Sequence, residues 1–484
     1  MFDRKIKEQI PLYVDLDGTL IRSDVAKELL IGTLAKPNHW GATLRAARKG
    51  LADLKQFLSE TAEFDAATLP YNDEVLAYIR EERDNGRRVI LATAADATAA
   101  QQVADHLELF DSVLASTPGN NLKGKAKLEA IKADAQGEFE YLGNAAPDLE
   151  IWKEAAQAGI VNAPRSVKAR AEKLTDTSLV VDNSPSMTQA LIKAIRPHQW
   201  AKNVLVLLPL FFSHSYFHPN MLGAALLAMA VFSMCASAIY IINDLLDIEA
   251  DRKHPRKRNR PFAAGTLSPV TGLFASLGLI ATAFAISITQ FNWGTTALFA
   301  LYILTTTLYS TWFKHKAAID IVVLTCLYTL RIFVGGVVLG VVVSPWLLNF
   351  SLFFFASLAL MKRLTEVQKL EETPEKTKVR GYFLGDTTAI MAMGVATGSM
   401  AVLTLTMYLN SPLVAETYAA PEMLWLVAPI VLFWIFRAWL LALRDQIDDD
   451  PVVFALRDRV SRAAIIAAAA LVPFAKFFTI EALF

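Results

Sequence analysis

Two groups of carboxylates in the sequence have spacings that suit phosphate chemistry, and the first lies near the N-terminus. Asp15 and Asp17 come directly after the apolar run Leu12-Tyr13-Val14, and Gly18 follows them. Side chains two residues apart on an extended chain point to the same side. One carboxylate of such a pair can attack a phosphorus atom while the other transfers a proton. We interpret this pair as a candidate site of phosphoryl transfer, with an Asx-rich turn as the alternative.

The second group lies far along the chain, at Asn243, Asp244, Asp247 and Asp251. On a continuous helix the three Asp residues fall at i, i+3 and i+7 and form one stripe. Stacked carboxylates repel one another, and at a helix C-terminus they also oppose the macrodipole, so a cation is needed between them. Mg²⁺ that bridges a diphosphate would supply it. The basic run 252–260 follows at once, which is typical both of a cytoplasmic loop and of an anion clamp.

The composition predicts a soluble domain joined to a membrane domain. Of the 484 residues, 54% are hydrophobic and 19% are charged, and the formal net charge is zero. Residues 1–195 contain 24 Lys and Arg against 29 Asp and Glu, a net charge of −5, and the rest of the chain carries +5. This composition excludes a mostly disordered chain. The two cysteines both lie in apolar runs, which excludes a disulfide framework. We expect no nucleic-acid partner.

From residue 203 onward the sequence is a series of apolar stretches, most of them long enough to cross a hydrocarbon core that needs about 20 helical residues. Lys and Arg occur in every second connecting loop. Loops with an excess of these residues are retained on the cytoplasmic side of the membrane. Residues 1–11 have no apolar segment typical of a secretion signal. We therefore predict a multi-pass protein of the cell (inner) membrane with a cytoplasmic N-terminal domain. The nine predicted spans are 203–218, 221–243, 269–290, 294–313, 319–343, 346–361, 386–409, 422–443 and 461–481.

The region before these spans predicts a soluble α/β domain. Over residues 1–165 short apolar runs alternate with amphipathic helical stretches, which favours a doubly wound, Rossmann-like sheet. A helical insertion at about 21–67, with helices at 25–34 and 44–58, is expected to cap the carboxyl edge of the sheet, where such folds bind ligands. We interpret residues 166–195 as a linker and residues 196–484 as an all-α membrane domain.

Three later segments of the soluble domain add polar residues in a recognisable order. They are 89–94, which contains Thr93, 121–127, which ends at Lys127, and 141–148, which contains Asn144 and Asp148. Together with the Asp15/Asp17 segment they resemble the four motifs of the haloacid dehalogenase-type phosphatase superfamily, and the resemblance covers nearly all of residues 10–160.

This resemblance implies a role for each matching residue. Asp15 would be the nucleophile and Asp17 the general acid/base, while Thr93 and Lys127 would hold the phosphoryl oxygens. Asn144 stands where the family usually has an Asp, which removes one negative charge from the surroundings of the metal. The implied surroundings of Mg²⁺ in this domain are Asp15, Asp17, Asn144 and Asp148.

The membrane domain resembles the UbiA-type intramembrane prenyltransferase superfamily over about 195–484. The pattern Asn243-Asp244-x-x-Asp247-x-x-x-Asp251 matches every fixed position of its first aspartate motif, which implies Mg²⁺ on these four residues and a catalytic role for Asp244 and Asp247. Most members grip a prenyl diphosphate with a second aspartate motif after the fourth span. This chain has a single Asp, Asp320, and three basic residues in the segment 309–320.

That departure, with the segments 196–203 and 362–366, resembles the decaprenyl-phosphate phosphoribosyltransferases. The resemblance implies a polyprenyl phosphate acceptor and 5-phosphoribosyl 1-diphosphate as donor, and basic loops suit three anionic groups in one cavity. At a rise of 1.5 Å per residue, Arg331 lies about 16 Å into its predicted span. An arginine at this depth is either a substrate ligand or one member of a structural ion pair. The expected substrate-binding residues are Lys202, Tyr240, Arg258, Arg260, Tyr309, Lys314, Asp320, Arg331, Lys362 and Arg363.

The two halves together predict a bifunctional, Mg²⁺-dependent enzyme. The membrane domain would make polyprenyl-phosphoryl-5-phosphoribose, and the tethered phosphatase would remove the 5-phosphate, toward a lipid-linked ribose or arabinose donor for a glycan. One alternative is an aromatic-acceptor prenyltransferase that consumes a prenyl diphosphate. Another is a phosphatase-like domain that acts only as a regulatory or binding module. A homo-oligomer is compatible with the sequence.

Overall fold

The computed structural model describes residues 10–34, 37–49, 57, 65–117, 120–370, 378–447 and 451–478. The chain forms two compact units. The first contains residues 1–195 together with 240–276, and the second contains residues 196–239 together with 277–484. The first unit therefore holds both the N-terminal α/β region and the segment that carries the aspartate motif.

The first unit is built on a six-stranded sheet in the order β3-β2-β1-β4-β5-β6, and every paired strand is parallel. Strands β2 and β3 lie on one side of β1 and strands β4 to β6 on the other, so the chain builds the sheet outward in both directions. This order confirms the doubly wound sheet. Ligands bind at the carboxyl ends of strands at such a switch point. The strands are β1 (Leu12–Val14), β2 (Val89–Asp96), β3 (Ser112–Ser116), β4 (Glu140–Gly143), β5 (Gln157–Val161) and β6 (Asp176–Val181).

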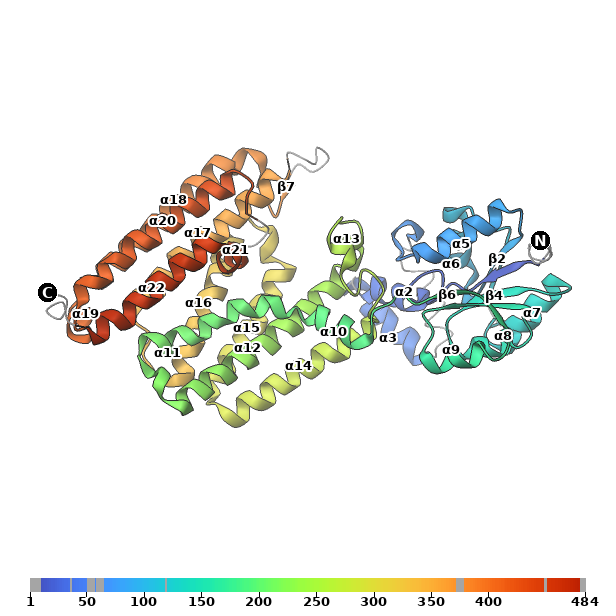
Figure 1. Ribbon diagram of the computed structural model, residues 1–484, viewed down its shortest axis with the longest axis horizontal. Coiled ribbons are helices and arrows are strands. Elements are labelled where there is room, and N and C mark those ends of the chain that lie inside the picture. Colours follow the sequence, from blue (N-terminus) through green and yellow to red (C-terminus); the bar gives the residue numbers. More distant parts are fainter. Residues whose placement is uncertain are drawn as a thin grey trace. The chain divides into compact units, whose positions relative to one another are not determined.

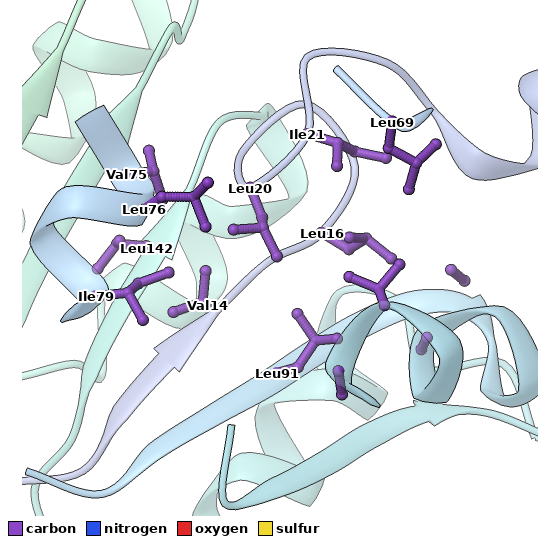
Figure 2. Close-up of a cluster of buried hydrophobic side chains, with 14 of the residues drawn as sticks. Val14, Leu16, Leu20, Ile21, Leu69, Val75, Leu76, Ile79, Leu91 and Leu142 are labelled. Carbon is purple, nitrogen blue, oxygen red and sulfur yellow. The ribbon is translucent and has the colours of Figure 1, made fainter. Parts of the chain in front are cut away.

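Helices cover both faces of the sheet (Figure 1). Helices α5 (Asp73–Asp84) and α6 (Ala97–Leu107) lie on one face, and α7 (Lys125–Ala135), α8 (Leu149–Trp152) and α9 (Arg165–Ala171) lie on the other. The alternation of side chains along β1 divides the core accordingly. Val14 packs in the cluster with Val75, Leu76 and Ile79 of α5, as Figure 2 shows. Tyr13 packs in the opposite cluster with Trp152.

The predicted insertion after β1 begins with helix α2 (Val25–Leu34), followed by the 3₁₀ turn η1 (Pro37–His39) and helix α3 (Trp40–Lys49). Most of the predicted helix 44–58 falls outside the described residues. The chain returns through η2 (Ala66–Thr68), and Ile21 bridges Tyr71 where the insertion leaves and rejoins the sheet domain.

The predicted linker at 166–195 is wrong. This segment contributes α9, strand β6, which pairs with β5, and helix α10 (Met187–Ile195). The segment contains several charged residues because β6 is an edge strand that presents exposed positions to solvent. In the sequence alone this composition is typical of a linker. The sheet domain thus continues to Ile195.

The second half of the chain is helical, and the prediction of nine spans is not confirmed. Among the described residues, seven helices are long and apolar enough to cross a membrane, which makes the chain a multi-pass membrane protein. They are α12 (Pro219–Leu246), α14 (Pro269–Gln290), α16 (Ile319–Leu339), α17 (Pro345–Gln368), Leu384–Leu409 with α18 (Thr387–Leu409), Pro421–Leu443 with α20 (Val427–Leu443), and α22 (Arg459–Phe477).

The other two predicted spans differ for separate reasons. The stretch 203–218 is broken into the 3₁₀ helix η4 (Pro197–Leu207), the short α11 (Leu208–Phe212) and the turn η5 (Ser215–Phe217). Pro209 stands in the first turn of α11 and cannot donate a backbone hydrogen bond. The stretch 294–313 forms a helix, α15 (Trp293–Thr311), but its threonines and N-terminal polar residues make it less apolar than the seven.

Short elements connect these helices. The aspartate motif continues from α12 into α13 (Ile248–Arg252), and the basic run contains the 3₁₀ turn η6 (Lys257–Asn259). A small hairpin of β7 (Lys378–Val379) and β8 (Tyr382–Phe383) follows α17 and was not predicted. The remaining elements are η3 (Ala146–Asp148), η7 (Phe313–His315), η8 (Leu384–Asp386), α19 (Pro412–Thr417), η9 (Pro421–Leu426) and α21 (Pro451–Arg457).

Candidate active sites

The carboxyl edge of the sheet brings three of the predicted phosphatase residues together. Asp15 follows β1, Lys127 lies in the first turn of α7, and Asp148 follows β4, and all three are buried. Lys127 Nζ donates to Asp15 Oδ1 at 2.8 Å and to the Tyr141 hydroxyl at 3.0 Å. The Tyr141 hydroxyl donates to Asp148 Oδ1, also at 3.0 Å. These contacts form a continuous chain from Asp15 through Lys127 and Tyr141 to Asp148.

Sequence analysis did not assign Tyr141 a role. The side chain is fully buried on β4, and its backbone carbonyl accepts a hydrogen bond from Trp152 Nε1. In the sequence Tyr141 belongs to an apolar strand, so no local signal separates it from an ordinary core residue. Only the meeting of β4 with α7 places its hydroxyl beside Lys127.

Burial dominates the electrostatics of the two aspartates. It raises the pKa of Asp15 to about 6, and the adjacent Lys127 ammonium opposes this shift. It raises the pKa of Asp17 to about 7, with a further contribution from the negative charge of Asp24. Asp17 Oδ1 accepts a hydrogen bond from the Val25 amide at 2.8 Å. The first turn of α2 therefore holds the orientation of this carboxylate.

Asn144 lies against the turn that carries the aspartate pair. A Cβ at Gly18 would stand 2.0 Å from Asn144 Nδ2, and Gly18 has φ +76°, so only glycine fits here. Asp148 Oδ2 accepts from the amides of Asn144 and Ala145 at 3.0 and 2.9 Å. Asp148 therefore orients the loop that carries Asn144, and both of its oxygens have protein donors.

Thr93 is fully buried on β2, and its hydroxyl oxygen accepts from the Ala95 amide at 3.0 Å. The sequence placed it at the end of a strand, whereas β2 continues to Asp96 with a register shift after Ala92. Its hydroxyl hydrogen can still be donated to an oxygen.

The donor chemistry of this site fits Mg²⁺. Within the described parts of the chain, no three His, Cys, Asp or Glu side chains stand close enough together to hold a metal ion. Asp15 and Asp17 in this turn and the Asn144 carboxamide beside Gly18 can offer oxygen donors, which Mg²⁺ prefers. A metal here would rely on an amide in place of one carboxylate.

The aspartate motif of the first unit holds an internal cation. Helix α12 ends at Leu246, and α13 begins after Asp247, whose amide still bonds to the Asn243 carbonyl at 3.0 Å. Arg260 Nη1 donates to Asp244 Oδ1 at 3.2 Å and to Asp251 Oδ2 at 2.6 Å. Both carboxylates are buried. The stripe therefore exists, and a guanidinium stands between two of its carboxylates.

Arg260 is predicted to bind substrate anions, and in this structure its guanidinium bonds to two carboxylates of the chain. The repulsion between the stacked carboxylates requires a positive charge, and Arg260 supplies it without leaving the chain. The carboxylate oxygens of this motif already bind one cation, and carboxylate oxygens are also ligands that Mg²⁺ prefers. Arg258 is exposed, and Asn243, Asp247 and Tyr240 are half-buried.

In the second unit, Asp320 and Arg363 bind each other. Arg363 Nε donates to Asp320 Oδ2 at 2.6 Å, and both side chains are fully buried. The Tyr382 hydroxyl donates to Asp320 Oδ1 at 2.8 Å, and Arg363 also pairs with Glu366 and donates to the Tyr309 hydroxyl at 3.0 Å. Asp320 and Arg363, which the sequence predicts to bind substrate, form a buried pair that joins α16 to α17.

Arg331 is buried in α16. A structural ion pair requires a carboxylate, and among the residues that the structure describes no carboxylate pairs with Arg331. Its Nε donates to Asn203 Oδ1 at 3.0 Å, and Asn203 in turn donates to Ser233 Oγ at 2.9 Å. The guanidinium lies over the rings of Phe232, Tyr302 and Tyr328, at 4.8, 5.3 and 5.3 Å from their centroids. Such stacking suits the planar, weakly hydrated guanidinium.

The same face of α16 accepts the broken segment η4. Gly335 lies one turn after Arg331, and a Cβ there would stand 2.1 Å from the Val206 carbonyl oxygen. η4 therefore packs directly on the helix backbone. It carries Lys202, which is buried, whereas the predicted anion ligands Lys314 and Lys362 are half-buried.

Comparison with known proteins places these features in a family. The UbiA prenyltransferase family model matches residues 204–473, more than half of the chain. The uncharacterized protein y4nM of Sinorhizobium fredii is 37% identical over 472 residues, which cover 95% of this chain and 89% of that protein. The decaprenyl-phosphate phosphoribosyltransferase of Mycolicibacterium smegmatis is 37% identical over 201 residues, which cover 40% of this chain and 62% of that enzyme.

A solved structure resembles the N-terminal region. A substrate-bound phosphoserine phosphatase complex aligns with 36% of this chain and 93% of its own, at 14% identity and a TM-score of 0.26. The family model covers the helical region together with the aspartate motif, and the likeness to y4nM extends over nearly the whole chain. The chain therefore belongs to the UbiA prenyltransferase family.

Proposed function

We propose that the membrane region transfers 5-phosphoribose from 5-phosphoribosyl 1-diphosphate to a polyprenyl phosphate, and that the N-terminal domain removes the 5-phosphate from the product. The likeness to a decaprenyl-phosphate phosphoribosyltransferase supports the first step. The cluster of Asp15, Lys127 and Asp148 supports the second. The dephosphorylated product would be a lipid-linked pentose, suited to donate ribose or arabinose to a glycan.

The observation that carries the transferase proposal is the Asp320–Arg363 pair. A second aspartate motif would bind a prenyl diphosphate through metal, but this carboxylate accepts from Arg363 and Tyr382 inside the protein. Both oxygens of Asp320 are engaged, and the side chain is fully buried. A prenyl diphosphate would therefore lack its second metal-binding carboxylate, which argues against the aromatic-acceptor alternative.

In the transfer step, the bond between ribose C1 and the diphosphate oxygen breaks and a bond from C1 to a lipid phosphate oxygen forms. The lipid phosphate is already anionic, so no strong base is required. Asp244, Asp247, Asp251 and Asn243 would hold Mg²⁺, which supplies charge neutralisation at the leaving diphosphate. Arg260, which bridges Asp244 and Asp251, would add positive charge beside the diphosphate.

In the phosphatase step, Asp15 attacks the phosphorus of the 5-phosphate and the bond to the sugar oxygen breaks. Asp17 donates a proton to that oxygen, and later takes one from the water that hydrolyses the aspartyl phosphate. A pKa of about 7 suits both roles near neutral pH. Lys127 and Thr93 would bind the phosphoryl oxygens, while Asp15, Asp17 and Asn144 would hold Mg²⁺.

The test uses the purified full-length protein with labelled 5-phosphoribosyl 1-diphosphate and polyprenyl phosphate. Mass spectrometry of the lipid product should show the dephosphorylated pentosyl lipid for the wild type. Asp15→Asn should stop at the phosphorylated lipid, and Asp105→Asn, an exposed carboxylate bonded to Gln101, should behave as wild type.

The same experiment separates the alternatives. The same product from wild type and Asp15→Asn would contradict the phosphatase proposal. Consumption of a prenyl diphosphate in place of the phosphoribosyl donor would contradict the transferase proposal.

A further inference from the structure

The segment that carries the aspartate motif contacts the insertion of the phosphatase domain through a buried ion pair. Arg252 follows directly after Asp251, and its Nη1 and Nη2 donate to Glu28 Oε2 and Oε1 at 3.1 and 2.7 Å. The two side chains are 7% and 12% exposed. Arg252 Nε donates to the Ala263 carbonyl at 3.0 Å, so the guanidinium is held on both sides. A bidentate pair of this kind has a defined geometry as well as a favourable energy.

The helix that carries Glu28 also orients Asp17. Helix α2 begins at Val25, whose amide donates to Asp17 Oδ1, and Glu28 lies three residues later in the same turn. The Glu28 amide bonds to the Asp24 carbonyl at 3.0 Å, which closes this turn. One helical turn is therefore fixed to the general acid/base of the phosphatase at one end and to Arg252 at the other.

Two further contacts join the segment that carries the aspartate motif to the sheet domain. At Gly265, with φ +69°, a Cβ would stand 3.0 Å from the Arg22 carbonyl carbon and 3.0 Å from Pro70 Cγ. The Arg22 amide bonds to the Pro70 carbonyl at 2.9 Å, and these two residues mark where the insertion leaves and rejoins the sheet domain. Gly265 therefore packs closely on this junction. Lys193 Nζ donates to the Asn259 carbonyl at 2.8 Å.

The loop on the other side of this contact is tied to the aspartate motif. Arg260 bridges Asp244 and Asp251, and Arg252 is the next residue after Asp251. A ligand that displaces Arg260 from these carboxylates acts on the segment 251–263, which also carries Arg252. Because Arg252 pairs with Glu28 of α2, this segment is linked to the helix turn that orients Asp17.

We propose that the Glu28–Arg252 pair couples the two sites, so that the phosphatase reaches full activity only while α2 is docked on the loop that follows the aspartate motif. This inference rests on the proposed phosphatase function. Glu28 and Arg252 are positioning residues, because they act on Asp17 through α2. A coupling of this kind is reciprocal between the binding equilibria of the two sites.

The experiment uses the full-length protein and the variants Glu28→Gln, Glu28→Asp and Asp65→Asn. Asp65 is the matched control, because it pairs with Lys253 on the same loop at 3.8 Å, but the two side chains are 55% and 66% exposed. Two readouts are taken: hydrogen exchange over residues 22–34, and the kcat and KM of hydrolysis of p-nitrophenyl phosphate with Mg²⁺.

Glu28→Gln should raise exchange over residues 22–34 and lower kcat about tenfold, the usual scale of coupling between sites, with KM unchanged. Glu28→Asp keeps the charge but loses reach, and should fall between Glu28→Gln and wild type. Asp65→Asn should match wild type in both readouts.

Wild-type exchange over residues 22–34 in Glu28→Gln would show that the docking contact does not exist and would overturn the proposal. Raised exchange with unchanged kcat would overturn the coupling. A wild-type protein without hydrolysis would contradict the proposed phosphatase function, and the exchange readout would still decide whether α2 is docked through Glu28.

Discussion

Lys127 Nζ lies 2.8 Å from Asp15 Oδ1, and both side chains are buried at the carboxyl edge of the sheet. The ammonium therefore stands beside the carboxylate that we propose as nucleophile, where it can neutralise an incoming phosphoryl group. Lys127 does not hold this position alone, because its Nζ also donates to the Tyr141 hydroxyl. The geometry of the pair depends on a residue from a third element.

The Tyr141 hydroxyl can be tested by a variant that removes one atom. Tyr141→Phe should lower phosphatase kcat/KM, because Lys127 and Asp148 each lose a buried hydrogen-bond partner. Hydrogen bonds to charged groups are worth about 1.5–3 kcal/mol, which corresponds to roughly 10- to 150-fold. Tyr13→Phe is the matched control, since the Tyr13 hydroxyl donates to Asp134 away from the site. Equal losses in the two variants would mean that Tyr141 does not position Lys127.

The raised pKa values predict that protons compete with Mg²⁺ at the proposed phosphatase site. Burial disfavours the charged forms of Asp15 and Asp17 and raises their pKa values from 3.8 to about 6 and about 7. As the pH falls from 8 to 5.5 both carboxylates take up protons that a metal must displace. The Mg²⁺ concentration for half-maximal hydrolysis of a phosphate monoester should therefore rise as the pH falls. A half-maximal concentration that does not change over this range would contradict the prediction.

The same two groups predict the sign of a stability change. A carboxyl whose pKa is raised on folding binds more protons in the folded state, so stability is greatest below its unfolded value and declines as the pH rises through its folded value. Without Mg²⁺ the melting temperature should fall between pH 4 and pH 7. Asp17→Asn should weaken this decline, because one of the two groups no longer titrates. A decline as steep as that of the wild type would contradict the assignment.

The Asp320–Arg363 pair should behave as a structural contact and not as a metal site. Asp320→Asn leaves a buried guanidinium short of one carboxylate, and loss of one partner of a buried pair costs about 3–5 kcal/mol. We expect a lower melting temperature and less folded protein, with the Mg²⁺ requirement of the transferase unchanged in the protein that remains folded. Asp445→Asn, an exposed carboxyl, serves as the control. A selective change in the Mg²⁺ requirement would contradict this prediction and indicate that Asp320 is a metal ligand.

Arg331 should stabilise the attachment of η4 to the helical core. Arg331→Lys keeps the charge but loses the planar group that stacks on three rings, and we expect a loss of about 2 kcal/mol, the scale of a desolvated cation–π contact. A double-mutant cycle with Asn203→Ala should show coupling between the two residues, which bond directly at 3.0 Å. The coupling is measured from the melting temperatures of the wild type, the two single variants and the double variant. Strictly additive losses would contradict the contact between Arg331 and Asn203.

The sequence was sufficient wherever the signal is local. Two aspartates after a buried strand, acidic residues at helical spacing, and long apolar stretches each follow from backbone periodicity, which acts over a few residues. The doubly wound sheet, the aspartate stripe at the end of α12 and the membrane-spanning character of seven helices were all predictable on this basis.

Tertiary structure alone decided which side chains meet. Lys127 is 112 residues from Asp15, and Arg363 is 43 residues from Asp320, so no spacing rule relates them. The resemblance predicts that Arg260 and Arg363 bind substrate, and packing also gives each of them a carboxylate of its own chain. A buried charge takes the nearest partner that offsets its desolvation, and that partner is set by how distant elements pack. For the same reason the pairing of β6 with β5, which replaced the predicted linker, was decided by the sheet and not by local composition.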